Sequence, residues 1–332
     1  MKQKQWRLFV IEKRVLNKTK IRTLLEERYH LKVKNIELIH GGSAEIYHVD
    51  DYILKLYQKK YGEKEICREI QVIEYLKARG FKVPVYLKTV SGDSFVKVED
   101  RILIVQHYIS GEVKEKFMAT KKEIQECGYL HGLMVKTLMD YDTMEVEGKD
   151  WFDVPKSIEK LKNAIQLGNH PMIVTDLKKK IEMLENLPSG LEDMDKISYY
   201  TSHGDFSYLQ FIYEKGKVNA IIDFIRVRKL PIVWEIMRSY SYMDRKCKNA
   251  EIDIDHLVLY VKEFMKNVKL TPYDLKYMPY VYMCQLLRST YGYKEYYQKD
   301  NNSILEFAHF RTKMCEYLFH HCDEISRRLE NL

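Results

Sequence analysis

Residues 203–224 read HGDFSYLQFIYEKGKVNAIIDF and place a carboxylate at each end of a predicted hairpin. Leu209 to Tyr213 and Val218 to Ile222 are apolar runs separated by a four-residue loop that contains a glycine, which predicts two strands. Asp205 precedes the first strand and Asp223 follows the second. In an antiparallel hairpin these positions lie at the same end, so we expect the two carboxylates to converge.

Convergent carboxylates have two interpretations. They can hold a divalent cation together, or one can hold the cation while the other orients a hydroxyl. Alternatively, Asp205 and Asp223 are a turn residue and a strand-end residue that face water, because aspartate is common at turns. The spacing alone leaves both interpretations open.

The composition is that of a folded protein with one large domain or two lobes. The chain has 332 residues, of which 45% are hydrophobic and 31% charged, which excludes a disordered or fibrous chain. The sequence contains no run of about 18 apolar residues, and its N-terminal stretch lacks the apolar core and cleavage site of a signal peptide. We therefore expect a soluble cytoplasmic protein with no membrane partner.

The cysteines and the net charge give no sign of a metal framework or a nucleic-acid surface. Six cysteines are scattered without a CxxC pair, which predicts reduced, mostly buried thiols. The net charge of +7 is spread along the chain. Its densest run, Lys178 to Lys180, alternates with apolar positions at helical spacing and predicts a solvated helix face. Nucleic acid is not an expected partner, since phosphate binding needs cations clustered on one surface.

The first third of the chain differs from the rest. After a helical stretch, residues 36–108 contain short β-like runs: IELIH, EIYHV, YILKLY, VPVYLKTV, SFVKV and ILIVQHY. One predicted helix, KEICREIQVIEYLKARG, lies between the third and fourth runs. From Gly111 onward the pattern is mainly helical, with helices expected over 120–138, 156–168, 174–187, 232–244, 252–267, 272–298 and 303–330. The sequence thus predicts an α+β fold.

The opening stretch resembles the signature of the aminoglycoside phosphotransferase and choline kinase superfamily, small-molecule relatives of protein kinases. HGD at 203–205, an amide at Gln210 and IIDF ending with Asp223 and Phe224 carry the resemblance. It implies a two-lobed protein-kinase-like fold, with a nucleotide-binding N-lobe at 1–108 and a C-lobe at 109–332 that carries the catalytic hairpin and acceptor-binding helices. The late helices also resemble the spore-coat-associated branch of the superfamily.

The resemblance implies a nucleotide site in the N-lobe. Gly42 and Ser43 match a short phosphate loop, although from the residues alone a plain β-turn is the simpler interpretation. Lys55 matches the lysine that contacts the α and β phosphates, with Glu69 as its expected partner and Glu65, one turn earlier, as the alternative. Backbone groups of the inter-lobe hinge would bind adenine, and the corresponding residues are Gln106, His107 and Tyr108.

The resemblance also assigns roles around the hairpin. Asp205 would accept or orient the proton of the acceptor hydroxyl, and His203 would fix the catalytic loop. Asp223 would bind Mg²⁺ beside the phosphates of ATP or GTP, with Gln210 as the second metal ligand. His131, in a Leu-His pair typical of the family, is expected to be structural.

Three features depart from the family pattern. Gln210 stands where most members have asparagine, which places the carbonyl oxygen one methylene further out. Arg226 and Arg228 alternate on a segment expected to be extended, where they either brace the loop or receive an anionic acceptor. Glu235 stands where the family has an aspartate that supports the catalytic loop.

The sequence therefore predicts a phosphotransferase that moves the γ-phosphate of ATP or GTP to a hydroxyl of a small metabolite, such as a sugar, an amino alcohol or an aminoglycoside-like compound. Late tyrosines of residues 273–297 are either walls for this acceptor or ordinary packing residues. The alternative is a catalytically weak or inactive kinase-like protein with a binding or structural role and a protein partner.

Overall fold

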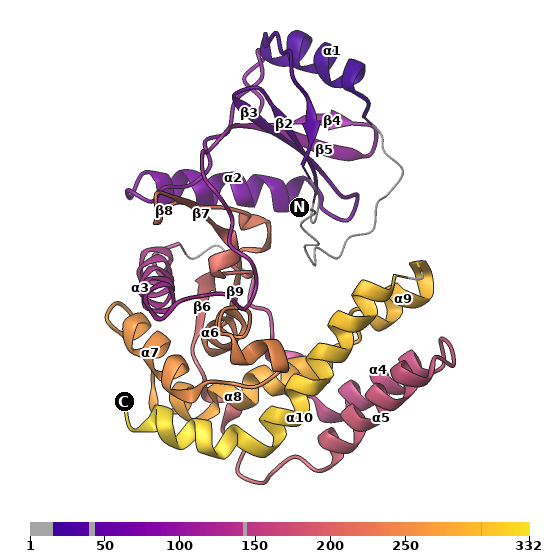
Figure 1. Ribbon diagram of the computed structural model, residues 1–332, viewed down its shortest axis with the longest axis vertical. Helices are drawn as coiled ribbons and strands as arrows, with labels where there is room; N and C mark the ends of the chain where they lie inside the picture. The colour runs from indigo at the N-terminus through magenta and orange to yellow at the C-terminus, as the bar shows by residue number, and fades with distance from the viewer. Residues whose placement is uncertain (1–15, 40–43, 142–144, 300) are drawn as a thin grey trace. The chain divides into compact units, whose positions relative to one another are not determined.

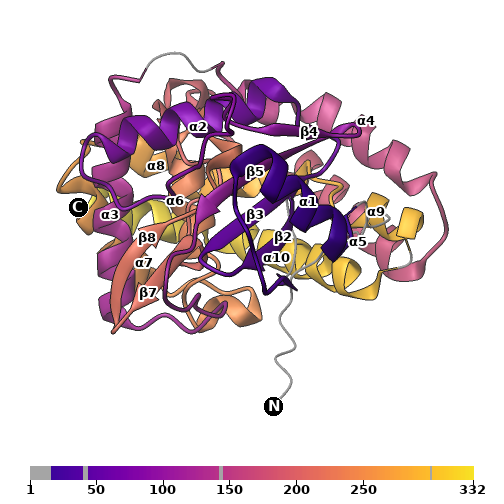
Figure 2. The same cartoon turned by 90° about the horizontal axis from the view of Figure 1, so that it is seen from above.

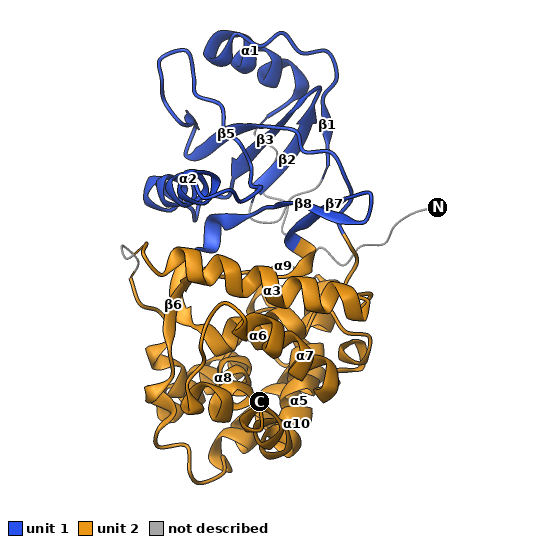
Figure 3. Ribbon diagram, turned by 90° about the vertical axis from the view of Figure 1, so that its left-hand side faces the viewer, with its two compact units in different colours: residues 1–113, 210–227 blue, residues 114–209, 228–332 orange. Residues whose placement is uncertain are grey.

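The computed structural model describes residues 16–39, 44–141, 145–299 and 301–332. The chain divides into two compact units (Figure 3). Unit 1 comprises residues 1–113 and 210–227, and unit 2 comprises residues 114–209 and 228–332. The hairpin that the sequence interpretation gave to the second lobe therefore belongs to unit 1. The functions expected for the two lobes remain predictions.

Unit 1 is built on a five-stranded antiparallel sheet with the strand order β1-β2-β3-β5-β4. The strands are β1 (Glu37–Leu38), β2 (Ala44–Val49), β3 (Tyr52–Tyr57), β4 (Val96–Val98) and β5 (Arg101–His107). The stretch VPVYLKTV was expected to be a strand but forms only an isolated bridge between Tyr86 and Gln106. Pro84 lies near its start and has no N–H to donate to a ladder.

Two helices, α1 (Lys18–Tyr29) and α2 (Glu63–Lys77), pack on this sheet (Figure 2). The α1 helix packs Ile21 and Leu25 into the same core as Leu54 and Leu56 of β3. The α2 helix packs Ile66 into a second core that contains Tyr57. Side chains alternate along a strand, so Lys55 lies on the Tyr57 side of β3, which faces α2. The pattern of YILKLY thus decides which face the lysine occupies.

The hairpin of unit 1 consists of β7 (Phe211–Glu214) and β8 (Lys217–Ile221). Its connection is shorter than expected, because Glu214 and Lys217 pair with each other and only two residues form the turn. These are Lys215 and Gly216, with φ of 50° and 73°. Positive φ at both central residues is the requirement of a type I′ turn, which suits the right-handed twist of the flanking strands.

Unit 2 is mainly helical, as expected (Figure 1). Its helices are α3 (Lys121–Leu138), α4 (Val154–Ile165), α5 (Pro171–Glu185), α6 (Ile232–Tyr240), α7 (Ile254–Met265), α8 (Pro272–Leu287), α9 (Tyr293–Lys299) and α10 (Asn302–Glu330). The single helix expected over 272–298 is wrong, since α8 and α9 are separated by a turn that contains Gly292 at φ 93°. A Cβ atom at Gly292 would lie 2.7 Å from Cβ of Ala308, so this close turn requires glycine.

A small two-stranded sheet in unit 2 was not predicted. It pairs β6 (Tyr199–Ser202) with β9 (Arg228–Pro231). Both strands are short and neither has a clear alternation of apolar and polar residues, so little in the sequence indicates them. None of the described helices has the length and apolar character needed to cross a membrane.

The run Lys178 to Lys180 is not a uniformly solvated face. Lys178 and Lys179 are exposed, but Lys180 is 1% exposed. Its Nζ donates hydrogen bonds of 3.0 Å to the carbonyl oxygens of Leu286 and Ser289, at the end of α8. Carbonyls at a helix C-terminus lack intrahelical partners and attract a cation. Burial nevertheless lowers the pKa of Lys180 to about 8.

This buried lysine predicts a specific pH dependence of stability. Above pH 8 the folded state loses the Lys180 proton before the unfolded state does, so the cost of burying the charge fades as the pH rises. We expect the free energy of unfolding of the wild type, relative to Lys180→Met, to rise by about 2 to 3 kcal/mol between pH 7 and pH 10. Urea unfolding at several pH values measures the difference. Lys178→Met, at an exposed position, is the control, and its free energy of unfolding should differ from that of the wild type by the same amount at every pH. The prediction is contradicted if the difference between the wild type and Lys180→Met is also independent of pH.

Candidate active site

Unit 1 contains a buried ion pair between β3 and α2. Lys55 Nζ lies 3.8 Å from Glu69 Oε1, and the two residues are 6% and 1% exposed. Glu69 also accepts hydrogen bonds from the hydroxyls of Tyr57 and Tyr86, at 2.7 and 2.8 Å. The alternative partner, Glu65, instead accepts a hydrogen bond from the backbone N–H of Gly62 at the start of α2. Lys55 is thus held by Glu69 in a fixed position on the central strand.

Asp223 lies at the end of β8 in a left-handed backbone conformation, with φ 67° and ψ 58°. Non-glycine residues in this conformation carry strain of about 1 to 3 kcal/mol and cluster at functional sites. The N–H of Ile222 donates a 2.9 Å hydrogen bond to the carbonyl of Gln210, which ties Gln210 to the residue before Asp223. The backbone of unit 1 therefore holds the two expected metal ligands close to each other along the hairpin.

The electrostatics of unit 1 suit a bound cation. Burial raises the pKa of Glu69, the charge of Lys55 opposes this rise, and the charge of Asp223 adds to it. The charges of Glu69, Lys55 and Asp223 therefore act on one another in a buried setting. Asp223 and Gln210 supply hard oxygen ligands of the kind that Mg²⁺ prefers. Within the described part of the chain, no group of three or more histidine, cysteine, aspartate or glutamate side chains is arranged so that it could hold a metal ion.

The stretch expected to bind adenine already uses two of its backbone donors. The N–H of His107 bonds to the carbonyl of Val85, and the N–H of Tyr108 bonds to the carbonyl of Asp51. The Tyr108 ring stacks on His48 with centroids 4.4 Å apart. Adenine binding here would have to use the carbonyls of this stretch or the N–H groups beyond Tyr108. Gly42 and Ser43, the expected phosphate loop, lie outside the described residues.

The expected catalytic loop, residues 203–205, belongs to unit 2 and is held by its own histidine. His203 is fully buried, and its Nδ1 accepts a 3.3 Å hydrogen bond from the backbone N–H of Asp205. Gly204, between them, has φ 76°. The Asp205 side chain is 22% exposed and forms an ion pair with Arg238 of α6. Asp205 thus presents its carboxylate at the surface of unit 2, fixed by a partner that the sequence reasoning missed.

A buried group on α6 braces the residue after Asp205. Glu235 Oε1 accepts a 3.1 Å hydrogen bond from the N–H of Phe206, and its Oε2 lies 3.2 Å from His131 Nε2. The His131 ring stacks on Phe206 at 4.3 Å, and its Nδ1 lies 2.9 Å from the Tyr260 hydroxyl. Burial alone would raise the pKa of Glu235, but its hydrogen bond and charge interaction with His131 leave that pKa lowered. The brace is therefore an ionised carboxylate beside a histidine whose pKa is lowered by burial.

One expectation about the chain after Asp223 needs correction. Arg226 and Arg228 do not alternate on one extended segment, because Arg226 belongs to the 3₁₀ turn Phe224–Arg226 and Arg228 begins β9. Arg228 Nε donates to Glu147 Oε1 at 2.7 Å, which is a bracing contact. The late tyrosines also pack mainly inside unit 2, since Tyr277 and Tyr280 are buried with their rings edge to face at 6.5 Å.

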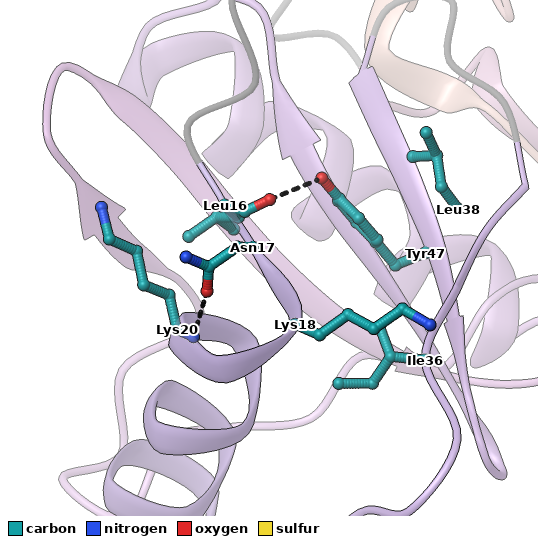
Figure 4. Close-up of a pocket in the computed structure, with 7 residues that line it drawn as sticks. All are labelled: Leu16, Asn17, Lys18, Lys20, Ile36, Leu38 and Tyr47. Atoms are coloured by element: carbon teal, nitrogen blue, oxygen red, sulfur yellow. Dashed lines mark hydrogen bonds between the residues drawn. The ribbon is translucent and has the colours of Figure 1, made fainter.

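Unit 1 also has a pocket whose lining residues come from α1, β1, β2 and their neighbours (Figure 4). Its volume is about 470 Å³, and its wall includes Leu16, Ile36 and Tyr47, with the hydroxyl of Tyr47 donating to the carbonyl of Leu16. None of the described residues assigned to nucleotide or metal is among these lining residues.

Comparison with known proteins identifies the family and the fold. The APH model, described as the phosphotransferase enzyme family, matches residues 35–254. No curated protein matches the chain. Among solved structures, the chain is similar to the amicoumacin kinase hAmiN in complex with AMP-PNP, Ca²⁺ and Ami, with 15% identity, a TM-score of 0.63, and coverage of 91% of this chain and 94% of that one.

Two further structures show the same fold. A microcompartment-associated aminopropanol kinase has 14% identity and a TM-score of 0.64, with coverage of 94% of this chain and 100% of that one. Spectinomycin phosphotransferase APH(9)-Ia, in complex with ADP and spectinomycin, has 15% identity and a TM-score of 0.59, with coverage of 96% and 99%. These similarities confirm the kinase-like α+β fold. Because the family model covers more than half of the chain, this protein belongs to the phosphotransferase enzyme family.

Proposed function

We propose that this protein transfers the γ-phosphate of ATP or GTP to a hydroxyl of a small metabolite. The observation that carries the proposal is the buried pair of Lys55 and Glu69 beside the strained Asp223. A lysine held by a helix glutamate is the arrangement with which kinases contact nucleotide phosphates. The nucleotide complexes of amicoumacin kinase and spectinomycin phosphotransferase support a nucleotide site in a fold of this kind.

The residues of unit 1 would hold the nucleotide and its metal. Lys55 binds the α and β phosphates, and Glu69 keeps its side chain in place. Asp223 and Gln210 hold Mg²⁺, which neutralises charge on the phosphates when bound. Glutamine supplies a carbonyl oxygen as asparagine does, on a longer side chain. These roles fit the charge interaction of Asp223 with the buried Glu69 described above.

The residues of unit 2 would supply the group that handles the acceptor. The acceptor oxygen forms a bond to the γ-phosphorus, and the bond from that phosphorus to the bridging oxygen of the diphosphate breaks. ADP or GDP leaves, and the hydroxyl proton passes to Asp205. Phosphoryl transfer needs positioning more than strong base catalysis, so the bonds that fix Asp205 and Phe206 serve the reaction directly.

The rival function is a kinase-like binding protein without turnover. The ion pair between Asp205 and Arg238 favours it, because a guanidinium already engages the carboxylate that would have to meet the acceptor hydroxyl. Gln210 at the metal position also favours it. Nucleotide binding and turnover separate the two functions, and a protein without either would direct the search to protein partners.

Thermal unfolding with and without Mg-ATP and Mg-GTP tests the proposal. At about 100 times the dissociation constant, a bound nucleotide stabilises the folded state by about 2.7 kcal/mol. We expect the midpoint of the wild type to rise by about 5 °C with Mg²⁺ present. In Asp223→Asn, most of the Mg²⁺-dependent rise in the midpoint should be lost, because the substitution removes a metal-binding charge.

The control is Asp51→Asn, which changes an exposed aspartate of unit 1 that is not assigned to metal. Its nucleotide shift should equal that of the wild type. No shift with either nucleotide, or an equal shift in Asp223→Asn, would contradict the assignment of Asp223.

A further inference from the structure

Four buried N–H groups of unit 2 have no hydrogen-bond partner among the described residues. They are Trp234 Nε1, Arg238 Nη1, Arg288 Nε and Arg311 Nε. Trp234 is 8% exposed and Arg311 is 9% exposed, so their donors are shielded from bulk water. A buried donor without an acceptor costs about 1 to 3 kcal/mol, and native proteins rarely leave several close together. They belong to α6, the end of α8, and α10, and α8 packs against both α6 and α10 (Figure 1).

Two of these arginines flank one aromatic pair. The guanidinium of Arg238 lies 5.4 Å from the centroid of the Tyr242 ring, and that of Arg311 lies 5.9 Å from the Phe307 ring. Tyr242 and Phe307 stack with centroids 6.1 Å apart. Lys116 Nζ lies 5.2 and 4.9 Å from the same two rings. We call Lys116, Arg238, Tyr242, Phe307 and Arg311 the cationic aromatic cluster.

The cations of the cluster act on one region of unit 2. Burial raises the pKa of the Tyr282 hydroxyl, and the charges of Arg311 and Arg238 both oppose that rise. One hydroxyl therefore lies within the influence of both guanidinium groups. Arg238 also pairs with Asp205, so the cluster begins at the candidate catalytic carboxylate.

The positive charge of the cluster is incompletely balanced. Asp205 neutralises Arg238, but the hydrogen-bond partners of Arg311 are neutral: Ser289 Oγ at 3.0 Å and Gln285 Oε1 at 3.5 Å. No carboxylate of the described residues is an ion-pair partner of Arg311. A buried cation without a counter-charge is costly, so an anion from outside the chain would stabilise it.

Stacking does not satisfy these donors. An aromatic ring attracts the face of a guanidinium, whereas the N–H groups lie in the plane of that guanidinium and still need acceptors. In-plane donors match the two oxygens of a carboxylate or phosphate. The unpaired Nη1 of Arg238 and Nε of Arg311 are donors of this kind.

A cavity of unit 2 adjoins Arg288, one of the four unpaired donors, and none of its lining residues belongs to the cluster. This cavity of about 480 Å³ is lined by residues that include Trp151 and Arg288. The Trp151 ring packs 5.1 Å from Trp234, and Arg238 lies 5.9 Å from that second ring. The Asp205 and Arg238 side chains each keep 22% exposure, so small molecules can reach them.

We propose that the cationic aromatic cluster is an acceptor subsite, and that it takes a hydroxylated molecule that also carries a carboxylate or phosphate group. The inference rests on the proposed phosphotransferase function. Arg311 and Lys116 bind the anionic group, and the Tyr242 and Phe307 rings contact the carbon skeleton. Acceptors with several positive charges, such as aminoglycosides, are disfavoured by like-charge repulsion.

The test uses ligands that share a skeleton and differ in charge. Glucose, glucose 6-phosphate, gluconate and glucosamine form one set; glycerol, glycerol 3-phosphate and glycerate form a second. Binding is measured by calorimetry with saturating Mg-ADP at constant ionic strength. In at least one set we expect an anionic member to bind at least 10-fold more tightly than the neutral one, with glucosamine no tighter than glucose. Comparison of the ligands that carry a phosphate with those that carry a carboxylate shows which anionic group the protein recognises.

Variants assign the effect to the cluster. Arg311→Gln should lose at least 10-fold in affinity for the anionic ligand, whereas Arg327→Gln, an exposed position on the same helix, should lose none. Lys116→Gln gives a second measurement at a half-buried position if the buried Arg311 variant does not fold. The inference is overturned if no anionic ligand binds more tightly than its neutral counterpart, if glucosamine binds most tightly, or if the folded cluster variants bind like the wild type. If one of these outcomes occurs while Mg-ADP still binds, the proposed function stands. If Mg-ADP does not bind, both the inference and the proposed function are overturned.

Discussion

Asp205→Asn is expected to reduce kcat by about 10²- to 10⁴-fold, the range typical of a lost general base, while Mg-ATP binds almost as tightly as to the wild type. The amide keeps the size of the side chain but cannot take the proton of the acceptor hydroxyl. Lys55, Glu69 and Asp223 belong to unit 1, whereas Asp205 belongs to unit 2, so the substitution leaves the proposed nucleotide and metal groups intact. Loss of turnover without loss of binding is therefore the signature of its role.

The measurement combines steady-state release of ADP with thermal unfolding in Mg-ATP. Asp255→Asn is the control, since Asp255 is an exposed carboxylate of unit 2 that also pairs with an arginine, Arg328. The thermal midpoint without ligand shows how much stability the loss of the Arg238 pair removes. An Asp205→Asn enzyme with wild-type turnover would remove Asp205 from the mechanism.

The sequence predicted the parts of the site that depend on local pattern. Alternation along YILKLY placed Lys55 on a strand face. Helical spacing left Glu69 and Glu65, one turn apart, as candidate partners, and the family resemblance favoured Glu69. The apolar runs on either side of Gly216 predicted the hairpin that carries Gln210 and Asp223. In each case the side-chain direction follows from a repeat of two or 3.6 residues, which a short stretch of sequence contains.

Contacts between distant segments were not predictable in this way. Arg238 meets Asp205, and Arg311 joins the same region as Arg238, only because of how α6 and α10 pack in unit 2. No local repeat encodes that packing. Gly292 breaks the expected helix because Ala308, in a later helix, lies against it.

Lys180 shows a signal that was present and misread. Ile173, Leu177 and Leu184 are buried residues of α5, and Lys180 falls between them at helical spacing. The run of three lysines suggested solvent, but only one face of a helix is exposed. Periodicity was the better guide than charge density at this position.

Gly132→Ala is expected to have the largest effect on stability. Helix propensity alone favours the alanine by about 0.5 to 1 kcal/mol. However, a Cβ atom at Gly132 would lie 2.3 Å from the carbonyl oxygen of Phe264 in α7, and one at Gly128 would lie 2.4 Å from that of Tyr260. Backbone atoms cannot yield as a flexible side chain does, so α3 and α7 must separate. We expect a net loss of about 3 kcal/mol, near the upper end of the range for overpacking.

The consequence reaches the catalytic loop through Tyr260. Its hydroxyl lies 2.9 Å from His131 of α3, and His131 contacts Glu235, which holds the N–H of Phe206. Separation of α3 from α7 therefore loosens the brace behind Asp205, and turnover should fall in the fraction of Gly132→Ala that still folds. Urea unfolding and ADP release measure the two effects, with the exposed Lys122→Ala on α3 as the control. A Gly132→Ala protein at least as stable as the wild type would show that propensity outweighs the contact, and that α3 and α7 are not packed backbone to backbone.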